Sequence, residues 1–324
     1  MGESCQAASA DSTSDDIRPK YRCCQAPSRW VNTRCQQLRY TDMTITYKDF
    51  VRVVPSGIMP DEELFNSMQG FVDDSCRRVR RFLGPELYDS IAAVNPDLGV
   101  PKLDHEGILA QACTRYICAR AYYEASAHLD LVLTATGFGV VNNDNVVPAS
   151  VDRVKALRDR LSRQMSDYYD EIKSEARYFE AWTTPVNIRI YFSTLYWHTR
   201  VLRLLGIANP TQSDLVEQRP AIMAAEAKLR TLISSEFFAE LCKAEATAST
   251  TVMQSEVIEL CREYVAAALR DHTPADTIVW RDRILSYLDD NLTEFPTYAA
   301  STNYKANHFD NYRNEQDDTC YFFG

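Results

Sequence analysis

No stretch of the 324-residue sequence approaches the roughly 18 to 20 apolar residues that a membrane-spanning helix needs. The first residues also lack the basic-then-apolar order of a signal peptide. Glycine is scarce, with ten residues, and Gly137-Phe138-Gly139 is followed by no Lys-Ser/Thr pair. We therefore expect no membrane contact, no use of the general secretory route and no phosphate-binding loop.

The sequence also lacks the patterns of metal and catalytic sites. Its histidines are scattered, and no two share the spacing that places two imidazoles on one helix face: His105, His128, His198, His272 and His308. Four cysteines near the N-terminus do not form a Cys-x2-Cys zinc knuckle: Cys5, Cys23, Cys24 and Cys35. The run 142–145 reads as a turn rather than a calcium loop, because consecutive Asn and Asp favour turns. No Gly-x-Ser-x-Gly elbow occurs. We expect no metal, no cofactor and no enzyme activity.

Composition favours a folded protein. Hydrophobic residues make up 45% and charged residues 25%, which are globular averages, so global disorder is excluded. Five further cysteines occupy apolar positions of helix-like segments, where a reduced thiol behaves as a small hydrophobe: Cys76, Cys113, Cys118, Cys242 and Cys261. The formal net charge of -10 repels nucleic acid overall, so we expect no specific nucleic-acid partner.

One basic cluster departs from this acidic balance, formed by Arg77, Arg78, Arg80 and Arg81. It could touch a phosphate backbone, although acidic neighbours such as Asp74 would partly neutralise it. A solvated helix face is the interpretation we favour.

The chain divides into four parts by pattern. Residues 1–42 are rich in polar residues and show no period, which predicts a disordered tail; Met43 is a candidate for the true start. Residues 43–182 and 183–305 show helical periodicity and predict two helical bundles, and 306–324 form an aromatic tail. The predicted fold class is mainly α, with at most short strands near 44–47 and 188–192.

The second bundle repeats the first in outline. Residues 82–91 align with 232–241 at an offset of 150, and apolar positions of 109–117 align with 257–265 at an offset of 148. A third block, Arg158 to Leu161, aligns with Arg281 to Ile284 at an offset of 123. Three blocks in the same order predict a duplicated helical unit, joined near 181–185, so that 72–125 and 222–270 should superpose.

Two segments stand outside the helical pattern. One is the glycine-containing run 133–145, which we expect to be irregular. The other is the C-terminal tail, whose aromatic residues would invite aggregation unless a pocket receives them, either on a neighbouring chain or on the chain's own body. From these two segments we predict partner-contact residues: Gly137, Phe138, Asn143, Asp144, Tyr321, Phe322 and Phe323.

The run 134–150 followed by Arg153, with the Leu-Gly-x-x-Leu-Tyr element at 83–88, resembles a family of uncharacterised proteins encoded by phages and prophages of Bacteroides-type bacteria. The likeness covers roughly 43–324. Such proteins are similar to head-to-tail connectors, which are helical bundles that form rings under the portal and receive the tail. The resemblance assigns no catalytic residues, and two bundles in one chain depart from the single-bundle form.

The resemblance implies a virion structural protein, a head-to-tail connector (adaptor), present in the host cytoplasm before assembly. Its partners would be other copies of itself in a ring, together with the portal and tail proteins of a phage. Two alternatives remain open. One is a helical scaffold or binding module unrelated to virions, and the other is an enzyme with an unrecognised site.

Overall fold

The computed structural model describes residues 43–54, 62–94, 96–127, 131–134, 137–140, 151–270 and 274–308. These residues belong to one compact unit, Tyr40–Gly324. The expected tail 1–42 and most of the aromatic tail 306–324 lie outside the described residues. The proposed boundaries of the two bundles stay predictions.

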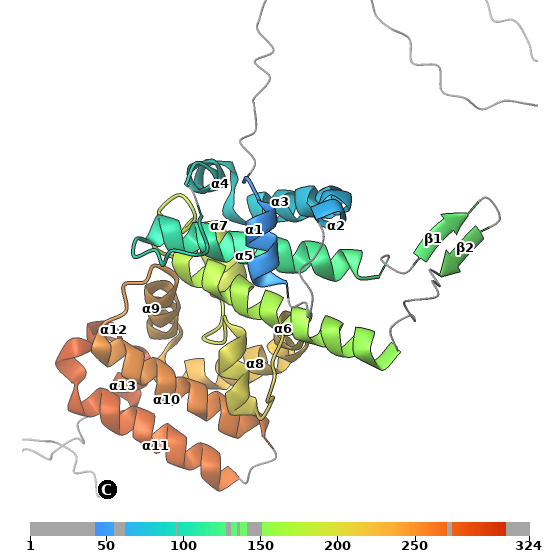
Figure 1. Cartoon of the computed structure of the whole chain (residues 1–324). Coiled ribbons are helices and arrows are strands. Elements are labelled where there is room, and N and C mark those ends of the chain that lie inside the picture. Colours follow the sequence, from blue (N-terminus) through green and yellow to red (C-terminus); the bar gives the residue numbers. More distant parts are fainter. Residues whose placement is uncertain are drawn as a thin grey trace, which may run out of the picture. The chain divides into compact units, whose positions relative to one another are not determined.

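The fold is mainly α, as the sequence predicts (Figure 1). The first part of the chain forms α1 (Tyr47–Val53), α2 (Glu62–Ser67), α3 (Gln69–Leu83), α4 (Pro85–Ala92), α5 (His105–Ala125), β1 (Leu131–Thr134), β2 (Gly137–Val140) and α6 (Val151–Ala176). The rest forms α7 (Pro185–Tyr191), η1 (Thr199–Leu205), α8 (Gln212–Ile233), α9 (Ser235–Ala246), α10 (Val252–Leu269), α11 (Pro274–Asp290), η2 (Leu292–Glu294), α12 (Pro296–Ala299) and α13 (Thr302–Asn307).

Helix starts follow local capping chemistry. Asp104 accepts a hydrogen bond from the Gly107 amide at the start of α5, and capping boxes at Thr46, Thr211 and Thr251 open α1, α8 and α10. Each of these side chains satisfies an amide that has no partner within its helix. The caps therefore fix where the amphipathic faces begin.

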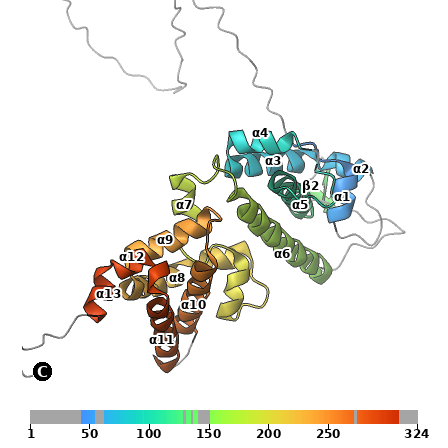
Figure 2. The same cartoon turned by 90° about the vertical axis from the view of Figure 1, so that its left-hand side faces the viewer.

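The first hydrophobic core lies around α5. This helix is buried on nearly every side, and it packs against α1, α3, α4 and α6. Figures 1 and 2 both show α5 and α6 side by side. The first core also takes in Trp182, whose indole Nε1 donates to the Phe82 carbonyl at 3.0 Å.

A second hydrophobic core joins α8, α9, α10, α11 and the segment 195–202. Phe237 packs against Phe295 and Tyr298, which come from the chain after α11, with ring centroids 5.5 and 5.9 Å apart. Five predicted buried cysteines divide between the two cores, and all lie buried in helices, as expected: Cys76, Cys113, Cys118, Cys242 and Cys261.

The internal repeat is visible in the structure as matching buried positions, residue by residue. The five buried positions of α3 and the five of α8 correspond one to one at the offset of 150: Val72, Ser75, Cys76, Val79, Leu83 and Ile222, Ala225, Glu226, Leu229, Ile233. The three buried positions of α4 recur in α9 at the same offset: Leu87, Tyr88, Ile91 and Phe237, Phe238, Leu241.

The turn between the first two helices repeats as well. Gly84 has φ 82° and ψ 159°, and Ser234, 150 residues later, has φ 81° and ψ 150°. Arg80 lies over the Tyr88 ring at 5.3 Å and Arg230 over the Phe238 ring at 4.4 Å, again at matching positions. The units α3–α4–α5 and α8–α9–α10, here named the first and second repeat, therefore share helix order, buried faces and connecting turn. Their superposition stays a prediction.

One local expectation was wrong, and the short strands that the sequence allowed at 44–47 and 188–192 do not form. The residues expected to be irregular contain an antiparallel hairpin, in which Leu133 pairs with Phe138 and Thr134 with Gly137. No strand forms at 44–47, where Tyr47 already begins α1 behind the Thr46 cap. Residues 188–191 belong to α7, because Thr184 caps this helix and Pro185 occupies its first position, and these signals outweigh the β-branched run.

Candidate functional site

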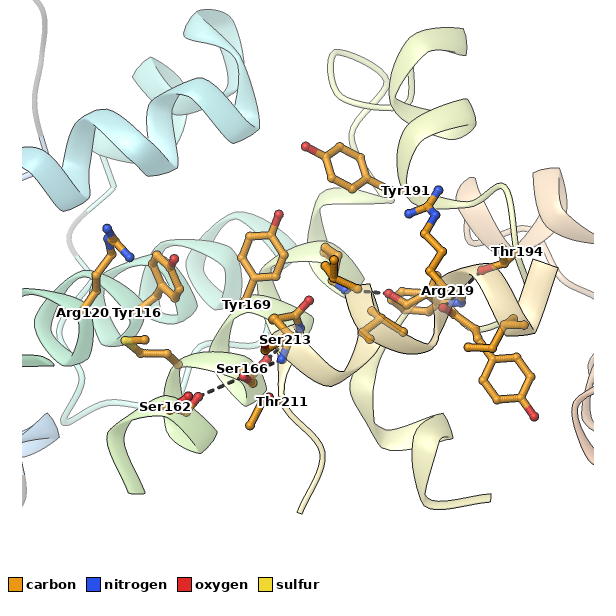
Figure 3. A pocket seen from close by; sticks show the side chains of 18 of the residues that line it. Tyr116, Arg120, Ser162, Ser166, Tyr169, Tyr191, Thr194, Thr211, Ser213 and Arg219 are labelled. Carbon is orange, nitrogen blue, oxygen red and sulfur yellow. Dashed lines mark hydrogen bonds between the residues drawn. The ribbon is translucent and has the colours of Figure 1, made fainter. Parts of the chain in front are cut away.

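A concave site in the described part of the chain lies between two helical walls. A cavity of about 400 Å³ separates α5 and α6 on one side from residues 191–197 with the first half of α8 on the other (Figure 3). A smaller cavity of about 220 Å³ shares four of its residues, Arg78, Tyr116, Tyr169 and Tyr191. We refer to the two together as the groove.

Aromatic side chains form much of the groove wall. Tyr116 of α5 and Tyr169 of α6 lie with ring centroids 5.9 Å apart, and Phe82 contacts Tyr169 at 5.0 Å and Tyr191 at 5.1 Å. Burial raises the pKa of the Tyr169 hydroxyl. This wall offers planar apolar surfaces with polar hydroxyls, a combination typical of binding surfaces.

Five basic residues line the groove, and none of its described lining residues is acidic: Arg78, Arg81, Arg120, Lys173 and Arg219. The charges of two of these residues are neutralised by neighbouring carboxylates. Arg120 pairs with Glu124 at 3.0 Å, and Lys173 pairs with Asp170 at 2.8 Å. The guanidinium groups of Arg78, Arg81 and Arg219 form no ion pair with a carboxylate of the described residues, so the groove carries a local positive excess in a chain of net charge -10.

Arg219 is held in position by the opposite wall. Its Nη2 donates to the Ile190 carbonyl at 3.0 Å and to Ser193 Oγ at 2.7 Å. Figure 3 shows Arg219 on this wall beside Thr194, with Tyr116 and Arg120 on the α5 wall. The remaining N–H groups of the Arg219 fork stay available for an anionic ligand.

A buried polar layer fixes the floor of the groove. Asp170 accepts hydrogen bonds from the Thr199 amide at 2.7 Å and from Gln212 Nε2 at 2.8 Å. Lys173 Nζ donates to the Trp197 carbonyl at 2.6 Å. Desolvation lowers the pKa of Lys173, and the charge of Asp170 opposes that shift. This layer ties α6 to η1 and α8, so its role is to hold the two walls together.

A second buried polar cluster lies in the second repeat. Glu226 Oε1 accepts from the Leu195 amide at 2.8 Å, and Arg262 Nε donates to the Leu195 carbonyl at 3.1 Å. Burial raises the pKa of Glu226 to about 7 and lowers the pKa of His198 to about 3. Glu226 Oε2 has no hydrogen-bond partner among the described residues, and Glu226 does not line the groove. We interpret this cluster as a fixing point for the 195–198 segment.

The structure describes two of the seven predicted contact residues. Gly137 and Phe138 belong to β2, while the other five, Asn143, Asp144, Tyr321, Phe322 and Phe323, lie outside the described residues. The predicted contact role of all seven stays a prediction.

The basic cluster of α3 divides between a solvated face and the groove. Arg77 is exposed and pairs with Asp74 at 3.6 Å, which fits the expected solvated face, whereas Arg80 is largely buried and pairs with Asp89 at 2.9 Å. Arg78 and Arg81 line the groove instead. The sequence held a signal here, because these two arginines are three residues apart and so lie on one helix face.

Two segments of the chain are similar to a known protein family. Residues 79–188 and 275–308 are similar to a family of unknown function, DUF6712. The first segment runs from the last turn of α3 to α7 and includes the α5 and α6 walls of the groove, while the α8 wall lies outside both segments. Neither the curated proteins nor the solved structures contain a match.

The described residues contain neither a membrane-spanning helix nor a metal-binding cluster. Their helices are all too short or too polar to cross a lipid bilayer. Within the same ranges, His, Cys, Asp and Glu side chains form no cluster of three with metal-binding geometry.

Proposed function

We propose that the chain is a virion structural protein, a head-to-tail connector that works through protein-protein contacts in a ring. The proposal rests on the resemblance of the 134–150 run and of the 83–88 element to phage proteins of this type. The mainly helical fold supports it, since a rigid helical body suits a component whose task is assembly.

The observation that carries the proposal is one highly exposed apolar side chain near the start of the third helix in each repeat. Leu103, which precedes the Asp104 cap of α5, is 94% exposed, and Val252, which follows the Thr251 cap of α10, is 86% exposed. Single exposed apolar residues are common, but here both repeats expose one at the start of their third helix.

A ring needs two different faces on each subunit. In a head-to-tail contact, one patch of a subunit meets another patch of the next, and the ring closes when the rotation allows it. Two related but unequal repeats supply two such faces within one chain. The hairpin residues Gly137 and Phe138 are further candidate contacts, for the portal or the tail protein.

Native mass spectrometry and negative-stain electron microscopy of the full chain test this proposal. The expected result is a single closed oligomer. Leu103→Glu and Val252→Glu should each abolish rings, because a charge buried in an interface is unfavourable. A mixture of the two variants should still give dimers, since one intact face of each remains. Val186→Ser, an exposed position on α7, serves as the control.

Two outcomes would contradict the proposal. A monomer at all concentrations favours the helical binding module unrelated to virions. Rings that survive both glutamate substitutions would show that these faces are not the contacts. Portal, capsid and tail genes beside the coding sequence would support the virion assignment, and a neighbourhood without them would weaken it.

A further inference from the structure

The groove requires an occupant of defined chemistry. Its described lining combines aromatic rings with three guanidinium groups that no described carboxylate neutralises, those of Arg78, Arg81 and Arg219. Arg78 and Arg81 are exposed along α3, and Arg219 is exposed on the facing wall. A ligand that fills this site must therefore carry both negative charge and flat apolar groups.

Apolar surface is also left open at the groove. Val216 of α8 lines it and is 73% exposed, next to the part-buried Leu215. A cavity of about 400 Å³ is within the range of sites that receive a few side chains or a small ligand. The site thus suits a short peptide segment with aromatic side chains.

One segment of this chain has that chemistry. Residues 315–323 read Glu-Gln-Asp-Asp-Thr-Cys-Tyr-Phe-Phe, with three acids followed by three aromatic residues and no basic residue. Its charge is opposite to that of the groove. Its aromatic residues match the tyrosine wall, where offset and edge-on ring pairs are favourable.

The segment is long enough to reach the groove of its own copy. Asn303 of α13 donates a hydrogen bond to the Thr231 carbonyl, which places the last described helix beside the C-terminal end of α8. The groove residues of α8 lie about four to five turns away, or roughly 24 Å at 1.5 Å per residue. From His308, an extended chain covers about 30 Å by Asp317, at roughly 3.3 Å per residue.

We propose that residues 315–323 dock in the groove of the same copy, with the acidic residues at Arg78, Arg81 and Arg219 and the aromatic residues against Tyr116, Tyr169 and Tyr191. Attachment to the same chain gives the segment a high effective concentration at the groove, which compensates for the modest strength of each contact. The aromatic residues of the tail then pack within the chain rather than on a neighbour.

Photo-cross-linking of the full chain tests the proposal. The photoreactive residue p-benzoylphenylalanine replaces Phe322, and copies with natural isotopes are mixed with 15N-labelled copies before irradiation. Peptide mass spectrometry then identifies the partners. The expected cross-links join position 322 to the segments 116–120, 165–173, 191–197 or 212–219, and both ends carry the same isotope.

Matched variants distinguish recognition by charge from non-specific hydrophobic association. Arg78→Gln/Arg219→Gln should lower the cross-link yield roughly fivefold, since each exposed charge pair contributes a fraction of a kcal/mol. Lys228→Gln changes the residue of the second repeat that corresponds to Arg78, and it should leave the yield unchanged. Circular dichroism checks that each variant keeps its helical content.

Three results would overturn the proposal. Cross-links between isotopically different copies alone would place the segment on a neighbour. Cross-links spread over other surfaces would show that the groove is not its site. An equal yield in the double arginine variant would remove the charge complementarity on which the assignment rests.

Discussion

The first and second repeats bury the same positions with different side chains. Cys76 in α3 corresponds to Glu226 in α8, and Thr114 in α5 corresponds to Arg262 in α10, and all four are buried. The first repeat therefore keeps small side chains where the second has ionisable ones. The helical framework thus tolerates a carboxyl and a guanidinium group at these buried positions, provided that they find partners such as the Leu195 backbone.

The two repeats also differ in the chain segments that pack at their ends. Trp182 and α7 pack against Phe82 at the end of α3, and the groove stays open beside them. In the second repeat, α13 reaches the end of α8 through Asn303. Lys228, the counterpart of Arg78, does not line the groove. Both repeats thus contribute to the groove, the first through α3 and α5 and the second through α8.

The largest effect should come from truncating a core position that the repeats share. Ile91→Ala and Leu241→Ala each remove a fully buried branched side chain, and each should lower the free energy of unfolding by about 2 to 5 kcal/mol. Urea denaturation measures both. The two losses should lie within about 1.5 kcal/mol of each other, and Leu103→Ala, at an exposed position, should change little. A large loss of unfolding free energy at one position and none at its counterpart would show that the two repeats do not share this core position.

The next effect concerns Glu226, whose counterpart in the first repeat is Cys76 rather than a carboxyl residue. Its pKa is raised to about 7 by burial, so the folded chain holds a proton that the unfolded chain has released. The resulting stability is fully present below the unfolded pKa of about 4.5 and is lost as pH rises through about 7. The difference amounts to about 3 kcal/mol.

Glu226→Gln should therefore be less pH-dependent in stability than the unaltered chain between about pH 5 and pH 8. Thermal unfolding at several pH values measures this. Glu236→Gln, at an exposed position of α9, is the matched control and should follow the unaltered chain. Identical pH profiles for the Glu226 variant and the unaltered chain would show that the carboxyl titrates normally in the fold.

A smaller effect should appear at the shared turn. Gly84→Ala places a side chain at φ 82°, ψ 159°, a region that essentially only glycine occupies, and should cost about 1 to 3 kcal/mol. Gly84→Ser should cost less, since Ser234 in the same conformation caps α9 by accepting from the Phe237 amide at 3.1 Å. Chemical denaturation of both variants measures the order. Equal losses would mean that the cap does not offset the strain.

Much of the fold could be predicted because its signals are local. The Asp104 cap, the Gly84-Pro85 break and the buried face of α5 follow from neighbouring residues, and the offset of 150 preserves the buried positions of the first two helices in both repeats. The hairpin at 131–140 could not be predicted in this way. Its four-residue strands carry too short a pattern to reveal the pairing of Leu133 with Phe138.

The groove could not be predicted for a different reason. Tyr116, Tyr169 and Arg219 are far apart in the sequence, and only the packing of α5, α6 and α8 brings them together. A tyrosine at a helical spacing fits a core as well as a binding wall, so its pattern alone does not separate the two. Arg78 and Arg81 were visible as a cluster, but their lack of acidic partners among the described residues is a property of the folded chain.

The most direct measurement compares hydrogen exchange in the full chain before and after neutralising the tail by Glu315→Gln/Asp317→Asn/Asp318→Asn. If the tail docks in the groove, exchange should become faster in 191–199 and 211–219, which form one groove wall, while α9 and α10 keep their rates. Unchanged exchange at the groove, or an increase spread evenly over both repeats, would contradict this account.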